Sequence, residues 1–287
     1  MLDKLVPLVG LALVAGCAPL QQSTFESALA RTEAATGGRI GVAVLDARGM
    51  QLEAYRGRER FAMCSTFKLA LAAAILQRVD RGTLSLDQTI AYDKSDIVFH
   101  APVTEKALVG DRGELTIRQL IEAIVQVSDN PAANLLLEKV GGPAGFTQFM
   151  RSAGDPASRL DRIETALNEN APGDPRDTTT PLAHAQLVRS LLLGDVLSEG
   201  SRSLLREIAT GTRTGTARLP AGTPDGWQIA HKTGSCGTAY NDIAVVWPNE
   251  AEPYVVAAYL DRPSVPAQQA EAAIAEVARL AAQSVTR

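Results

Sequence analysis

The chain has 287 residues, of which 46% are hydrophobic and 21% charged, with a net charge of −4 and an isoelectric point near 5.5. This composition is typical of a globular protein with a full core, in one large domain or two lobes, and the acidic balance argues against a nucleic-acid partner. The three histidines are scattered, no Cys/His ligand spacing occurs, and there is no glycine-rich nucleotide loop. We therefore expect no metal site and no cofactor.

Residues 1–17 have the features of an export signal. Lys4 precedes an apolar run at 5–15 that is too short to span a bilayer, and two small residues then lead to Cys17. This ending resembles the bacterial lipoprotein box, in which the cysteine is lipidated and becomes the mature N-terminus. The alternative is an ordinary secretory signal cut near Ala18. In both cases we expect a periplasmic protein, and in the first case it is attached to a membrane through the lipid on Cys17.

Two other cysteines, Cys64 and Cys236, remain after this segment. In an exported protein two remaining cysteines are candidates for one disulfide. The alternative, two free buried thiols, is more typical of cytosolic proteins.

The N-terminal part predicts a helix, a β-hairpin and a second helix. A capping-box pattern of Ser23 and Glu26 begins the first helix, and Gly37 and Gly38 end it. The expected elements are a helix at 23–36, strands at 39–45 and 50–55, and an apolar helix that follows Ser65 and closes at Gly82.

The middle of the chain predicts helices, and the C-terminal part returns to strands. The expected elements are helices beginning at Thr116 and Pro131, helices at 145–153, 181–193 and 201–210, strands at 228–235, 240–247 and 254–260, and a final helix at 266–282. Asn130 is expected to cap the helix at Pro131. Segment 159–180 is polar and has no periodicity, and a long loop of this kind inside a compact domain usually has a function.

This order of elements predicts an α/β (α+β) fold. Two N-terminal and three C-terminal strands would form one five-stranded antiparallel sheet flanked by the terminal helices. We expect residues 18–60 and 211–287 to form this α/β lobe, residues 61–210 to form an all-helical lobe, and the two to make a single catalytic unit. A cleft between lobes is a common place for a small-molecule site.

The pattern Ser65-x-x-Lys68 places a hydroxyl and an amine on one face of a helix, because residues i and i+3 are neighbours there. Lys68 Nζ can then reach Ser65 Oγ, and a serine becomes a good nucleophile when a base takes its proton. Alone, this pattern occurs by chance in many proteins. Three further motifs follow in order, namely Ser128-Asp129-Asn130, Glu164-Thr165-Ala166-Leu167-Asn168 and Lys232-Thr233-Gly234.

With these four motifs the chain resembles a class A serine β-lactamase over nearly its whole length. The resemblance implies that Ser65 forms an acyl-enzyme with the β-lactam and that Lys68 takes or relays the proton. Ser128 would pass a proton to the departing nitrogen. Glu164, with Asn168, would hold and activate the water that hydrolyses the ester.

The same resemblance implies the groups that bind the substrate. The backbone N–H groups of Ser65 and Ser235 would form the oxyanion hole. Asn130 would hydrogen-bond the substrate's side-chain amide, and Lys232 would supply positive charge near its carboxylate. The implied substrate-binding residues are His100, Asn130, Asn168, Arg218, Lys232, Thr233, Gly234 and Ser235. The Ser128-Asp129-Asn130 triplet could otherwise be an ordinary turn with a helix cap.

The loop that carries Glu164 has to be held in place. The family implies an ion pair between Arg162 and Asp177 that closes the loop, and a cis peptide bond between Glu164 and Thr165. The alternative for the charged pair is two unrelated surface residues, worth less than about 1 kcal/mol.

The segment from Lys232 to Gly237 looks like that of class A carbapenemases, which join the two cysteines corresponding to Cys64 and Cys236. Arg218 as a second carboxylate-binding cation, and His100 as a ring at the pocket mouth, fit the same subgroup. A plain surface histidine is the alternative for His100. The chain departs from the family in a longer loop at 109–114.

We therefore expect a monomer that hydrolyses β-lactam antibiotics, including carbapenems, and so gives antibiotic resistance. One alternative is a penicillin-binding DD-peptidase, which uses the same Ser/Lys set, but Glu164 and Asn168 argue against it. A second is a β-lactam-sensing module that is acylated without turnover, and the sequence offers no signalling domain for it.

Overall fold

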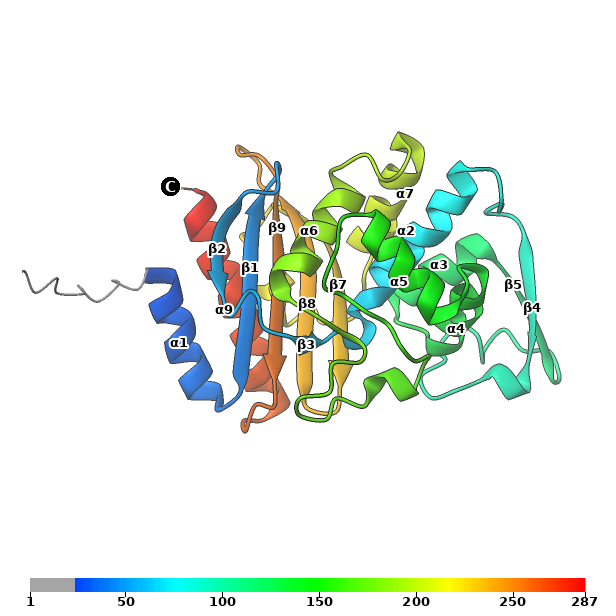
Figure 1. Cartoon of the computed structure of the whole chain (residues 1–287), viewed down its shortest axis with the longest axis horizontal. Helices are drawn as coiled ribbons and strands as arrows, with labels where there is room; N and C mark the ends of the chain where they lie inside the picture. The colour runs from blue at the N-terminus through cyan, green and yellow to red at the C-terminus, as the bar shows by residue number, and fades with distance from the viewer. Residues whose placement is uncertain (1–23, 287) are drawn as a thin grey trace, which may run out of the picture.

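The computed structural model describes residues 24–286, and its centre is a five-stranded antiparallel sheet (Figure 1). The strands are β1 (Arg39–Asp46), β2 (Gln51–Tyr55), β7 (Gln228–Cys236), β8 (Ala239–Trp247) and β9 (Tyr254–Asp261). They lie in the order β2-β1-β9-β8-β7. Two N-terminal and three C-terminal strands thus form one sheet, which confirms the predicted fold class.

Helices cover both faces of this sheet. The terminal helices α1 (Thr24–Thr36) and α9 (Ala267–Val285) pack on one face, and α6 (Pro181–Leu192) packs on the other (Figure 1). Successive side chains of a strand point to opposite faces. Accordingly, Val42 and Val44 of β1 join the core under the terminal helices, whereas Ala43 and Leu45 join the core shared with the middle helices.

The middle helices pack around α2 (Phe67–Asp80), which begins two residues after Ser65. They are α3 (Ile117–Gln126), α4 (Asn130–Lys139), α5 (Gly142–Ser152) and α7 (Glu199–Thr210), whereas the short α8 (Leu219–Gly222) packs on α9. Every residue of α2 from Phe67 to Leu76 is buried, so the helix is apolar on all sides and lies inside the core. The N-terminus of α2 is therefore held rigidly.

Two details of the middle segment differ from the sequence-based prediction. The segment is not wholly helical, because β4 (Thr89–Asp93) pairs with β5 (Arg112–Thr116), and β3 (Phe61–Ala62) pairs with β6 (Thr178–Thr179). Part of the loop expected at 109–114 thus lies in β5. The cap of α4 is Asp129 and not Asn130, because the Asp129 carboxylate accepts a hydrogen bond from Ala132 N at 2.9 Å.

The predicted export signal, Cys17 and the Ser23 cap lie outside the described residues. Within 24–286, no helix combines the length and the apolar character needed to cross a bilayer.

Candidate active site

Ser65 lies in a 3₁₀ turn (Cys64–Thr66) that leads directly into α2. Its side chain is half-buried at a pocket of about 690 Å³. The pocket is lined by Ser65, Phe99, His100, Ser128, Asn130, Thr165, Ala166, Asn168, Glu169, Thr214, Gly215, Arg218, Thr233, Ser235, Cys236 and Gly237. The four motifs of the sequence therefore meet around one cavity, at the N-terminus of a buried helix whose dipole favours negative charge.

Lys68 is fully buried below Ser65. Its Nζ donates to Ser128 O at 2.9 Å and to Asn130 Oδ1 at 2.5 Å, and it lies 2.9 Å from Glu164 Oε1. Among the described residues, Lys68 Nζ forms no hydrogen bond with Ser65 Oγ, the hydroxyl that the helical spacing allows it to reach. Burial lowers the pKa of Lys68, and the Glu164 carboxylate opposes part of that decrease. A lowered pKa makes it easier for the Lys68 amine to release a proton and so to relay one.

Ser128 Oγ lies between the two lysines of the site. Lys232 Nζ donates to it at 3.1 Å, and Lys68 Nζ lies 3.5 Å away. Lys232 is fully buried, and burial together with the nearby Lys68 charge moves its pKa well below the ordinary lysine range. Ser128 has a φ of 63°, in the left-handed region that side chains rarely adopt. This conformation places the hydroxyl between the two amines.

Glu164 is buried beside Lys68, at the base of the pocket. Asn168 Nδ2 donates to Glu164 Oε2 at 2.6 Å. Asn168 Oδ1 is a buried acceptor that receives no hydrogen bond from the described residues, and the close donor to Glu164 Oε1 among them is Lys68 Nζ at 2.9 Å. The peptide bond between Glu164 and Thr165 is cis, as predicted.

An asparagine that the sequence analysis missed fixes the backbone of Glu164. Asn134 Nδ2 donates to Glu164 O at 2.9 Å, and Asn134 Oδ1 accepts from Glu164 N at 2.9 Å. Asn134 lies one turn after Asn130 in α4, on a helix otherwise rich in apolar residues. The one signal for Asn134 in the sequence was its position four residues after Asn130, because residues at i and i+4 lie on the same face of a helix.

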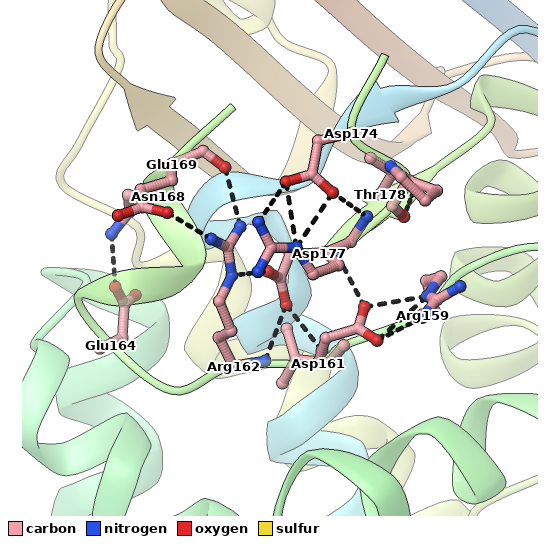
Figure 2. A network of polar contacts seen from close by, with 12 residues as sticks. Arg159, Asp161, Arg162, Glu164, Asn168, Glu169, Asp174, Asp177 and Thr178 are labelled. Atoms are coloured by element: carbon pink, nitrogen blue, oxygen red, sulfur yellow. Dashed lines mark hydrogen bonds and ion pairs between the residues drawn. The ribbon is translucent and has the colours of Figure 1, made fainter. Parts of the chain in front are cut away.

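The loop at 159–180, here called the Glu164 loop, is closed by ionic contacts at its neck (Figure 2). Arg162 Nε lies 2.6 Å from Asp177 Oδ2, and Asp177 is only 1% exposed. Asp177 Oδ1 also accepts from the backbone N–H groups of Asp161 and Arg162, at 2.7 and 3.0 Å. The predicted Arg162–Asp177 pair is thus confirmed, and it is a buried, hydrogen-bonded pair.

Strand β7 approaches the 3₁₀ turn that contains Ser65 closely at Gly234. A Cβ atom on Gly234 would lie 2.7 Å from Met63 O and 3.0 Å from Thr66 N, so only glycine fits there. The next residue, Ser235, therefore lies next to Ser65 at the pocket wall. Thr233 Oγ1 shares a hydrogen bond of 2.6 Å with Thr214 Oγ1.

Arg218 is a buried cation behind the end of β7. It donates to Ser235 Oγ at 2.7 Å and to Gly234 O at 3.2 Å, and it pairs with Glu271 at 3.2 Å. Its guanidinium therefore orients the Ser235 hydroxyl as well as lining the pocket.

The predicted disulfide and the predicted ring both border the pocket. Cys64 and Cys236 are joined, with 5.6 Å between their Cα atoms, so the residue before Ser65 is covalently linked to the end of β7. His100 lines the pocket beside Phe99, and its Nε2 lies 2.9 Å from Val127 O. In the part of the chain that the structure describes, no cluster of His, Cys, Asp and Glu side chains could hold a metal ion.

Comparisons with known proteins agree with this arrangement. The profile of the Beta-lactamase enzyme family matches residues 24–285. The chain is 42% identical over 274 residues to Beta-lactamase CTX-M-8 of Citrobacter amalonaticus, which covers 94% of this chain and 93% of that protein. It is 43% identical over 258 residues to the carbapenem-hydrolyzing beta-lactamase KPC of Klebsiella oxytoca, with coverages of 89% and 87%.

A solved structure, that of an ancestral (GNCA) β-lactamase of class A, superposes on 91% of this chain and 99% of its own with a TM-score of 0.86 and 53% identity. The fold and the convergent motifs described above are those of the same class, and the disulfide is the one that the resemblance to the carbapenemase type implied. The chain therefore belongs to the β-lactamase enzyme family and is a serine β-lactamase of class A.

Proposed function

We propose that the enzyme opens the β-lactam ring through an ester on Ser65. Ser65 Oγ attacks the lactam carbonyl while its proton passes to Lys68, whose pKa burial lowers. The backbone N–H groups of Ser65 and Ser235 stabilise the oxyanion, and removing such a donor typically costs about 10²–10³ in rate. Ser128 delivers a proton to the departing nitrogen, and Lys232 and Lys68 on either side of its hydroxyl supply the positive charge.

Glu164 completes the cycle by clearing the ester. Asn168 Oδ1 is a buried acceptor without a hydrogen-bond donor among the described residues, and Glu164 Oε1 has its charged contact with Lys68, so each oxygen can still accept one O–H group of the same water molecule. Glu164 takes the proton of that water as it attacks the acyl carbonyl. The position of this carboxylate beside Lys68 is the observation that carries the proposal, because a peptidase or a sensor needs no such group.

We further propose that carbapenems are among the substrates. The Cys64–Cys236 bridge supports this breadth, as does the likeness to a relative named for carbapenem hydrolysis. All pocket groups come from one chain, so we propose that the enzyme acts as a monomer.

A substrate panel on purified protein tests the reaction and its breadth together. Steady turnover of a chromogenic cephalosporin, a penicillin and a carbapenem is expected. A single stoichiometric burst without a steady rate would instead support an acylated sensor or a slow peptidase.

The bridge should matter more for carbapenems than for penicillins. In the Cys64→Ser/Cys236→Ser variant, which leaves no unpaired thiol, we expect a loss of up to about 5 kcal/mol of stability, because the bridge closes a loop of 172 residues. At a temperature where both proteins are folded, carbapenem kcat/KM should fall more than penicillin kcat/KM. Equal losses for the two substrates would remove the link between the bridge and carbapenem hydrolysis.

We also propose that the enzyme is exported to the periplasm and anchored by a lipid on Cys17. The sequence pattern before Cys17 supports this proposal. The Cys17→Ser variant should leave the membrane fraction and appear in the soluble fraction of the cell. If the variant and the wild type distribute alike, the protein has an ordinary signal.

A further inference from the structure

The outer end of the Glu164 loop, residues 169–171, lies between two cavities. Glu169 lines the substrate pocket, whereas Asn170 and Ala171 line a second cavity of about 540 Å³ on the other side of the loop. Arg39 and Arg262 are among the residues on the far wall of that second cavity. Glu169 and Ala171 are exposed and Asn170 is half-buried. Packing alone therefore does not fix this segment, and its polar contacts decide where it lies.

Asn170 makes the contacts that join this segment to the sheet. Asn170 Nδ2 donates to Cys236 O at 3.3 Å, at the end of β7. Arg262, the residue after β9, donates from Nη2 to Asn170 O at 3.0 Å. Among the described residues, these are the hydrogen bonds that connect residues 165–173 with β7, β9 or the residues that follow them.

Arg262 is held in an unusual backbone conformation. Its φ is 50°, in the left-handed region that residues with a Cβ atom rarely adopt, and its Nη1 lies 3.1 Å from Asp261 Oδ2. An observed outlier of this kind is a reason to look for a function. In this chain the residue with the unusual conformation is Arg262, whose guanidinium donates a hydrogen bond to Asn170 O.

The other partner of Asn170 is a fixed point of the pocket. Cys236 is bonded to Cys64 and, with Gly237, lines the pocket beside Ser235. The hydrogen bond from Asn170 to Cys236 O therefore sets the distance between the Glu164 loop and the end of β7. That distance is the width of the pocket on the side where both Glu169 and Cys236 form the wall.

We propose that Asn170, held by Arg262, is a specificity-determining residue that restricts the enzyme to β-lactams with compact side chains. This inference rests on the proposed β-lactam hydrolysis. The neck of the loop is held separately by the Arg162–Asp177 pair, and Asn134 holds the backbone of Glu164. Removing the hydrogen bond from Asn170 to Cys236 O therefore widens the pocket and leaves the Glu164 carboxylate in place.

The test uses two cephalosporins with the same nucleus, one with a compact and one with a bulky branched side chain. Asn170→Asp keeps the shape of the side chain but replaces the donor with an oxygen that repels Cys236 O. The ratio of kcat/KM for the bulky over the compact substrate should rise about fivefold to tenfold, the range that corresponds to one lost hydrogen bond. The kcat for the compact substrate should change less than about twofold.

Two further variants separate the geometric effect from the added charge. Arg262→Ala should raise the same ratio, and the double variant should add little to either single change, because both act on one contact. Asn249→Asp, an equal charge change in the exposed turn between β8 and β9, should leave the ratio unchanged. Amide hydrogen exchange of residues 166–173 should be faster in Asn170→Asp than in the wild type.

The outcomes distinguish this inference from the proposed function. If the variants turn over both cephalosporins with an unchanged ratio, or lose both in equal proportion, the assignment of Asn170 is wrong while the hydrolase remains. If the wild type shows no steady turnover of either substrate, the proposed function itself fails.

Discussion

Glu164→Gln is expected to lower steady turnover by about 10²–10⁴-fold, the range that a general base contributes. The amide keeps the shape of the side chain and its place beside Asn168, but it cannot take a proton from water. Ser65, Ser128 and Lys232 remain, so the ring should still open. The ester on Ser65 should therefore accumulate.

The accumulated ester is visible as a mass increase on intact protein equal to the mass of the β-lactam, located on Ser65 by peptide analysis. Glu169→Gln is a matched control, because Glu169 is another carboxylate of the same loop, 74% exposed and paired with Arg162 at 2.7 Å. It should turn over near the wild-type rate without a lasting adduct. A steady turnover rate of Glu164→Gln within tenfold of the wild-type rate would contradict the role assigned to Glu164.

Asp177→Asn should destabilise the protein. It should also slow the hydrolysis of the ester on Ser65, because Asp177 helps to hold the loop that carries Glu164. The carboxylate is 1% exposed and is bonded to Arg162 Nε and to two backbone N–H groups. Breaking a buried pair of this kind costs about 3 kcal/mol, at the lower end of the usual range because Arg162 keeps Glu169 as a partner. Asparagine tolerates the φ of 56° at this position, so the change acts through the lost charge.

For a domain of this size, that loss corresponds to a fall in Tm of about 6–12 °C. Below the transition, kcat should also fall, because the loop no longer fixes Glu164, and acylation should be less affected than deacylation. Asp174→Asn offers a comparison on the same loop, since its partner Arg176 is 49% exposed and solvent screens that pair. An Asp177→Asn protein as stable as Asp174→Asn would show that the neck pair does not hold the loop.

Much of the site could be predicted because its residues lie in short sequence motifs. Ser65, Ser128, Glu164 and Lys232 were expected in one cleft because their four motifs together resemble those of class A serine β-lactamases, and the structure places all four around Lys68 and the pocket. The strands of the sheet were also clear, because β1, β8 and β9 are long apolar runs separated by turn residues.

Other features depended on contacts that local patterns do not encode. Asp129 and Asn130 are equally good helix caps, and tertiary contacts decide between them: the Asp129 carboxylate also accepts from Val103 N and Thr104 N, whereas the Asn130 side chain bonds Lys68. The partners of Lys68 could not be predicted for a similar reason, because helical spacing shows which groups a lysine can reach and not which partner it bonds.

The position of the two terminal helices has a practical consequence. Helix α1 packs on α9 and on β2, the edge strand opposite β7, so the start of α1 and the end of α9 lie away from the β7 edge that borders the pocket (Figure 1). A carrier protein, a solid support or a reporter could therefore be attached at either of these ends while the entrance used by antibiotics stays open to the surrounding solution.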